Sequence, residues 1–180
     1  MTTRDEGHWE TFSERTLYDS PWVRLVKVDV QPPGGSRFEH HVVRLQRVAL
    51  VAMVNDREEV LLLWKHRFVT NQWGWELPGG IVDPGEESAD AAKREACEET
   101  GWMPRSVQHL LSFQPAIGMV DSPHDVYVSR DAEYVSDARD SEETGVAKWT
   151  PLASVTDMAA QGDLLGSGSL VALLYLLARR

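Results

Sequence analysis

The chain has 180 residues, of which 42% are hydrophobic and 26% charged, enough for one ordinary core and a small appendage. Its net charge of −10 argues against non-specific binding to a polyanion, so we expect no nucleic-acid partner. No stretch approaches a membrane span, the first residues lack the apolar region of a secretory signal, and the single cysteine leaves no internal disulfide, so we expect a cytoplasmic protein without a membrane partner.

The N-terminal part predicts a strand pair outside the main core. Residues 22–30 (WVRLVKVDV) alternate with the period of a strand, and the Pro-Pro-Gly-Gly run at 32–35 then breaks the chain before an extended stretch at 38–45. We therefore expect a small β extension over residues 1–45.

The next two segments predict buried strands. Residues 47–54 (RVALVAMV) are nearly all apolar, as in a strand buried on both faces. Asn55 and Asp56 favour a turn into residues 59–65 (EVLLLWK), so we expect a hairpin that leads into the site.

Residues 88–100 predict a helix. Ser88 is the expected N-cap, and Gly101 is placed to end the helix in a left-handed conformation. A strip of small residues lets the helix lie close against a sheet: Ala89, Ala92 and Ala96.

Three further short strands are expected at 107–114, 124–129 and 146–149, and a closing helix within 165–180. Strands arranged around one central helix, with a second helix at the end, are compatible with a mixed sheet between helices.

The helix carries a cluster of carboxylates on one face. Glu95, Glu98 and Glu99 have the spacing i, i+3, i+4, at which like charges cost roughly 0.2–0.5 kcal/mol per pair. A hard divalent cation such as Mg²⁺ prefers such oxygen ligands and shares them with substrate phosphates. The competing interpretation is an ordinary solvated helix rich in charged residues.

The full spacing favours the metal site. Gly80 is followed after five residues by Glu86 and after seven more by REACEETGW at 94–102. This pattern resembles the Nudix box, G-x5-E-x7-R-E-U-x-E-E-x-G-U, where U is a bulky apolar residue and Ala96 is small for its position. The resemblance implies a metal-dependent hydrolase of nucleoside diphosphates linked to another group. It also implies an α/β/α sandwich with a mixed sheet over residues 46–180.

The resemblance also implies roles for single residues. Glu95, Glu98 and Glu99 would bind Mg²⁺, or Mn²⁺ in its place, together with the carbonyl of Gly79, and Glu98 and Glu99 would thereby be catalytic. Arg94 and Glu86 would form an internal ion pair that orients the loop against the helix.

The flanks resemble the ADP-ribose pyrophosphatase branch of that family. The residues that carry this likeness are KHR at 65–67 followed by WGWELPGG at 73–80, with Pro115 further on. The branch implies a homodimer in which both subunits build each pocket. It also implies that Arg67, Trp75 and Gly80 bind substrate, with Trp73 as a second stacking candidate. A surface arginine and packed tryptophans are the competing interpretation.

The general base is open at this point. The loop after Pro115 reads GMVDSPHD and lacks the glutamate that many members of the branch place there. Asp121 is the first candidate, Asp125 lies where the next strand is expected, and Glu142 and Glu143 belong to an acidic segment that could equally be a solvated loop.

Together these features predict Mg²⁺-dependent hydrolysis of the pyrophosphate bond of a nucleoside diphosphate sugar, with ADP-ribose giving AMP and ribose 5-phosphate. Another nucleotide sugar or a dinucleoside polyphosphate is an alternative substrate. A nucleotide-sensing protein that binds without turnover is the alternative function, although a pure sensor has no physical need for three mutually repelling glutamates.

Overall fold

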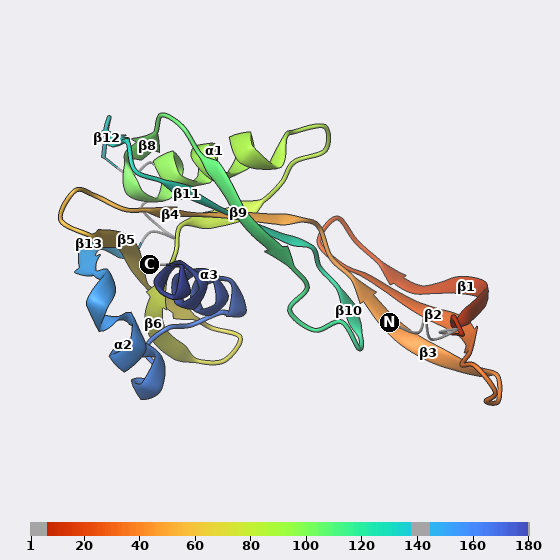
Figure 1. Cartoon of the computed structure of the whole chain (residues 1–180). Coiled ribbons are helices and arrows are strands. Elements are labelled where there is room, and N and C mark those ends of the chain that lie inside the picture. The colour runs from red at the N-terminus through yellow and green to blue at the C-terminus, as the bar shows by residue number, and fades with distance from the viewer. Residues whose placement is uncertain (1–6, 138–144, 180) are drawn as a thin grey trace. The chain divides into compact units, whose positions relative to one another are not determined.

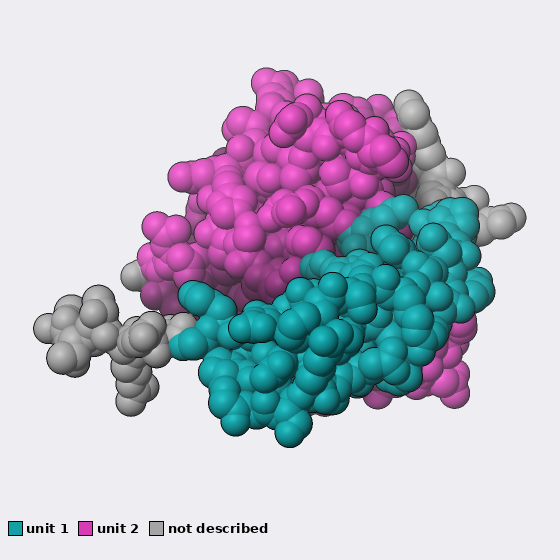
Figure 2. Space-filling view, turned by 90° about the vertical axis from the view of Figure 1, so that its right-hand side faces the viewer, with its two compact units in different colours: residues 1–46, 116–122 teal, residues 47–115, 123–180 magenta. Residues whose placement is uncertain are grey.

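The computed structural model describes residues 7–137 and 145–179. The chain divides into two compact units, coloured separately in Figure 2. Unit 1 combines residues 1–46 with residues 116–122, and unit 2 combines residues 47–115 with residues 123–180. No helix among the described residues is long and apolar enough to cross a membrane.

Unit 1 is one four-stranded sheet in the order β1-β2-β3-β10. Its strands are β1 (Glu10–Asp19), β2 (Arg24–Gln31), β3 (Phe38–Arg44) and the two-residue β10 (Val120–Asp121). The expected strand pair is present as β2 and β3, which run antiparallel. Strand β1 was not expected, because it is exposed along its whole length and therefore has no buried face that would mark it in the sequence.

Unit 2 contains the other strands and the helices of the described residues (Figure 1). One sheet has the order β7-β4-β11-β9, a second β13-β5-β6, and a third β12-β8. The strands are β4 (Val48–Met53), β5 (Glu59–Arg67), β6 (Gln72–Glu76), β7 (Gly79–Ile81), β8 (Trp102–Pro104), β9 (Gln108–Phe113), β11 (His124–Ser129), β12 (Ala132–Tyr134) and β13 (Val146–Pro151). The helices are α1 (Ser88–Thr100), a 3₁₀ turn (Leu152–Ser154), α2 (Val155–Gln161) and α3 (Ser167–Ala178).

Strand β4 belongs to the central layer of the sandwich, and its alternate residues pack against the two opposite outer layers. Ala49, Val51 and Met53 pack with the alanines of α1. Leu50, Ala52 and Val54 pack with α3 and its neighbours. Figure 1 shows α1 and α3 on opposite sides of this sheet. Because β4 pairs parallel with β11 and antiparallel with β7, the sheet is mixed, and the predicted α/β/α sandwich is confirmed.

The expected hairpin between 47–54 and 59–65 is wrong. The turn forms, with the amide of Glu58 donating to the Asn55 carbonyl at 3.0 Å, and Val54 bridges Val60. Beyond that bridge the two strands separate into different sheets, where β5 pairs with β6 and β13. An apolar run predicts burial but leaves the pairing partner open.

The predicted helix is confirmed as α1, and its C-terminal end is as expected. Gly101 has φ 75° and its amide donates to the carbonyl of Cys97 at 2.9 Å. The expected N-cap is wrong, because Glu87 takes that position without a side-chain cap bond. The Ser88 hydroxyl donates instead to Asp125 at 2.8 Å, which joins the start of α1 to β11.

Candidate functional site

The acidic face of α1 is held in place by groups from two strands. The amide of Gly79, in β7, donates to Glu99 Oε2 at 2.9 Å, and the Lys65 ammonium, from β5, ion-pairs with Glu99 Oε1. Lys65 and Glu99 side chains are only 8% and 13% exposed. The Glu99 carboxylate is therefore fixed from both sides inside the fold.

Arg94 joins the remaining carboxylates. Its guanidinium donates to Glu86 at 2.9 and 3.0 Å, to Glu95 at 2.8 Å and to Glu98 at 3.2 Å, and it also reaches the Ile81 carbonyl at 3.1 Å. The bond from Arg94 holds the pKa of the Glu86 carboxyl below its usual value. This arrangement fastens the loop before α1 to the helix.

Gly80 and Glu95 lie in direct contact. A Cβ on Gly80 would stand 2.5 Å from the Glu95 carboxyl carbon, so only glycine leaves room for that carboxylate. Burial raises the pKa of the Glu95 carboxyl, the nearby charges of Glu98 and Glu99 raise it further, and Arg94 opposes both effects. A divalent cation would favour the charged form of such a group.

The acidic face fits a divalent metal by its chemistry. Three carboxylates lie near one another on this face of α1, since the charges of Glu98 and Glu99 act on Glu95, and hard oxygen donors are what Mg²⁺ takes. The close approach of Gly80 leaves room for Glu95 in this group. Within residues 7–137 and 145–179, no three His, Cys, Asp or Glu side chains stand as a ready metal-binding group, and Arg94 and Lys65 engage the glutamates instead.

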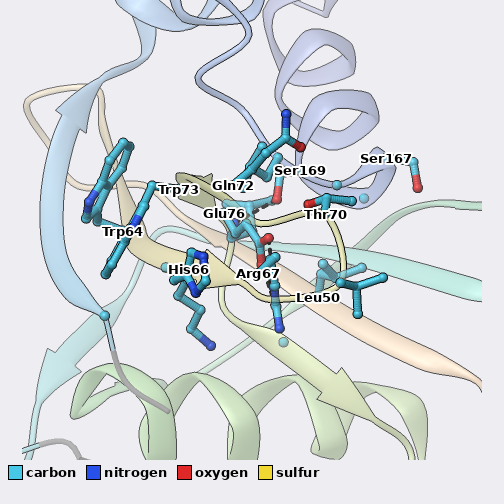
Figure 3. A pocket seen from close by; sticks show the side chains of 18 of the residues that line it. Leu50, Trp64, His66, Arg67, Thr70, Gln72, Trp73, Glu76, Ser167 and Ser169 are labelled. Carbon is cyan, nitrogen blue, oxygen red and sulfur yellow. Dashed lines mark hydrogen bonds and ion pairs between the residues drawn. The ribbon is translucent and has the colours of Figure 1, made fainter. Parts of the chain in front are cut away.

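A pocket of about 810 Å³ opens beside this face in unit 2 (Figure 3). Both groups that hold Glu99, Lys65 and Gly79, line it, whereas the three glutamates of α1 are not among its lining residues. Most of the remaining wall comes from the β5–β6 hairpin and the start of α3, including Trp64, Trp73 and Ser167, with further residues from β4 and β11. The pocket and the acidic face are therefore joined through Lys65 and Gly79.

The residues expected to bind substrate take different positions. Arg67 lines the pocket and donates from Nε to both carboxylate oxygens of Glu76, at 2.9 and 3.1 Å. Trp75 packs against the core, with its ring 5.1 Å from that of Trp64. Trp73, which is 59% exposed and stacked with Trp64, lines the pocket.

The candidate bases differ in how they are held. Asp121 lies in β10 of unit 1 and accepts a bond from Arg44 at 2.9 Å. Asp125 lies in β11, where it accepts bonds from Ser112, Ser88 and Arg47 at 2.6, 2.8 and 2.8 Å. Glu142 and Glu143 lie outside the described residues.

Sequence reasoning assigned no role to Lys65. A signal existed, because Leu61, Leu63 and Lys65 fall on one face of β5 by strand alternation. Leu61 on that face packs with the alanines of α1. A lysine in line with residues that face the helix would therefore point toward its glutamates.

Comparison with known proteins agrees with this geometry. The NUDIX domain model matches residues 44–168. The chain is 41% identical over 169 residues to a CMP-5′-(N-acetyl-N-hydroxy-3-aminopropyl)phosphonate hydrolase of Streptomyces rubellomurinus, covering 94% of this chain and 82% of that protein. It is 30% identical over 166 residues to an ADP-ribose pyrophosphatase of Mycobacterium tuberculosis, covering 90% and 80%.

A solved structure shares the fold. The crystal structure of an ADP compounds hydrolase superposes with a TM-score of 0.84 at 20% identity, over 98% of this chain and 96% of that one. The family match and the two relatives rest on most of the sequence. The chain therefore belongs to the NUDIX domain family, as a Nudix pyrophosphohydrolase.

Proposed function

We propose that this enzyme hydrolyses, with Mg²⁺, the pyrophosphate bond of a nucleoside diphosphate sugar, and that ADP-ribose is its first candidate substrate, giving AMP and ribose 5-phosphate. The supporting observation is the acidic face of α1, whose Glu99 is held by Lys65 and Gly79, two residues that line a pocket large enough for such a molecule. The likeness to an ADP-ribose pyrophosphatase supports the choice of sugar nucleotide.

In this proposal, Glu95, Glu98 and Glu99 bind Mg²⁺ with the Gly79 carbonyl, and Mn²⁺ can replace it. The chemistry that the metal supplies when bound is neutralisation of the diphosphate charge and activation of a water. Arg94 and the Gly79 amide orient the carboxylates.

Four other residues are assigned to the substrate and the proton. Arg67 contacts phosphate or nucleoside from the pocket wall. Gly80, beside Glu95, and Trp75, packed on Trp64, bind substrate from outside the lining of that pocket. Asp121 is our candidate for the base that takes the proton of the water. It suits the role better than Asp125, whose carboxylate is buried and already accepts three hydrogen bonds.

A second candidate substrate is CMP joined to a phosphonate. The relative at 41% identity bears the name of a hydrolase for such a compound, and this chain is more similar to it than to the ADP-ribose pyrophosphatase. Both candidate substrates join a nucleoside 5′-phosphate to a second phosphorus centre, so the same acidic face would serve either.

A substrate panel tests the proposal. Purified enzyme in Mg²⁺ would receive ADP-ribose, other nucleotide sugars, a dinucleoside polyphosphate and a CMP-phosphonate, and the products would be separated by ion-exchange chromatography. We expect nucleoside monophosphate to be released, fastest from ADP-ribose, and release to stop in EDTA. Equal rates across the panel would remove the preference for ADP-ribose, and a faster CMP-phosphonate would replace it. Undiminished turnover in EDTA would contradict the role of the metal.

We also propose that the enzyme acts as a homodimer through unit 1, in the cytoplasm. Strand β1 is the edge of its sheet and exposes Phe12, Leu17 and Tyr18. An edge strand with apolar side chains is suited to pair with a second copy.

A further inference from the structure

Lys65 is a charged residue buried beside the acidic face. Its side chain, 8% exposed, belongs to a strand in which residues 60–63 are buried and apolar. It ion-pairs with Glu99, whose other oxygen is occupied by the Gly79 amide. A buried charge of this kind is tolerated only while it is paired, since removal of one partner leaves the other desolvated and uncompensated. The Lys65 and Glu99 pair should therefore persist until another cation takes the place of the ammonium or another anion takes the place of the carboxylate.

Two cationic side chains, Arg94 and Lys65, pair with different glutamates of the site. Arg94 contacts Glu86, Glu95 and Glu98, and Lys65 contacts Glu99. Lys65 thus takes a carboxylate oxygen that the proposed metal site requires. A lysine ammonium carries a full positive charge, so it and a metal ion would compete for the same carboxylate.

We propose that Lys65 is an internal counter-cation that competes with the divalent metal for Glu99. The inference rests on the metal site of the proposed function. Without metal, the ammonium stabilises Glu99 in its place on α1. When a divalent cation binds, the ammonium gives up Glu99 and turns toward the pocket that it already lines, where an anionic substrate can pair with it. Lys65 is thus a positioning residue that lowers the affinity of the free enzyme for metal.

The proposal predicts opposite effects on stability and on metal binding. Replacement of Lys65 by a neutral residue leaves Glu99 buried without a cation, so the metal-free protein loses stability. The same replacement removes the competing charge, so metal binds more tightly. A lysine that only supports the fold would weaken metal binding when removed, because the carboxylates would lose their arrangement.

The test uses Mn²⁺ as the probe, with the free ion measured by electron paramagnetic resonance. The proteins are the wild type, Lys65→Gln, Lys65→Arg and the control Lys93→Gln. Glutamine keeps a donor for Glu99 without the charge, whereas arginine keeps the charge. Lys93 lies on α1, the helix that carries Glu99, but it pairs with Asp90 at 3.2 Å. Its replacement by glutamine therefore changes the net charge as Lys65→Gln does, without removing a partner of Glu99.

We expect Lys65→Gln to bind Mn²⁺ at least about fivefold more tightly than wild type, the lower end of typical coupling between sites. Lys65→Arg and Lys93→Gln should bind as wild type does. In EDTA the midpoint of thermal unfolding should fall for Lys65→Gln alone, and added Mn²⁺ should raise it more than in wild type. If Lys65→Gln fails to fold in EDTA, refolding on addition of Mn²⁺ gives the same support.

The inference alone is overturned if wild type binds Mn²⁺ and Lys65→Gln binds it equally or more weakly. It is also overturned if Lys65→Arg binds as tightly as Lys65→Gln, because the effect would then be independent of charge. A wild type that binds no Mn²⁺ at all overturns the metal site of the proposed function together with this inference.

Discussion

At Gly80 the backbone lies close against the acidic face of α1. Gly80→Ala would place a methyl group 2.5 Å from the Glu95 carboxyl carbon. That neighbour is the far end of a flexible side chain, so we expect the fold to survive while Glu95 moves out of the metal site. Mn²⁺ affinity and turnover should both fall, with an unchanged circular dichroism spectrum. Full metal affinity in Gly80→Ala would show that Glu95 is not a ligand.

Glu98 is the carboxylate best suited to a direct test of the metal site. Its side chain is 40% exposed and, among the residues that the structure describes, pairs with Arg94 at 3.2 Å, so Glu98→Gln should leave the fold intact. Loss of a ligand charge should lower turnover by about a thousandfold, or about 4 kcal/mol of barrier.

The measurement is kcat on the best substrate of the panel in saturating Mg²⁺. Glu87→Gln is the matched control, because Glu87 is exposed at the N-cap of the same helix. Normal hydrolysis by Glu98→Gln would refute the assignment of the ligands.

At the scale of elements, periodic segments were predictable and exposed or short ones were not. Strand β4 has apolar residues on both faces, and α1 has its alanines at helical spacing, so burial explains both. Strand β1 has no buried residue, and β7 and β12 have three residues each, so neither pattern nor length marks them.

The candidate site was predictable only where its parts are close in sequence. The glutamates lie within one helical turn, and their common face follows from its pitch. The Lys65 and Glu99 pair spans 34 residues, so it depends on how β5 packs against α1. The pocket wall likewise combines β5, β6 and the start of α3, which no local pattern brings together.

The anchor between α1 and β11 predicts a pH dependence. Burial raises the pKa of the Asp125 carboxyl, but hydrogen bonds from Ser112, Ser88 and Arg47 outweigh burial and hold the pKa below its ordinary value of 3.8. A carboxyl whose pKa is lower in the folded state stabilises the fold fully above its unfolded pKa. That stabilisation is lost as the pH falls through the folded pKa.

Asp125→Asn should therefore lower the free energy of unfolding near neutral pH by about 2 kcal/mol. Its deficit relative to wild type should shrink as the pH falls below 3.8. Urea unfolding at several pH values measures both. Asp56→Asn, in the exposed turn after β4, is the control. A deficit of Asp125→Asn that stays constant with pH would contradict the role of its charge.

At the scale of the whole molecule, the proposed dimer predicts a mass. Light scattering should give twice the 20.2 kDa of the chain. Leu17→Glu, on the exposed edge strand β1, should shift the protein to monomer, because it puts a charge into an apolar contact. Val135→Glu, at a position of similar exposure in unit 2, should remain a dimer. A wild-type monomer at all concentrations would refute the proposal.

Unit 1 is built from two separate stretches of the chain, which limits how the protein could be shortened. The segment 116–122 leaves the catalytic part of the chain between Pro115 and Pro123, and its strand β10 pairs in parallel with β3. Deleting the first 46 residues would strip β10 of its only neighbour in that sheet among the described strands, exposing its backbone amides and carbonyls to water. An N-terminal deletion would thus damage an excursion that begins some seventy residues later and that contains Asp121, our candidate base.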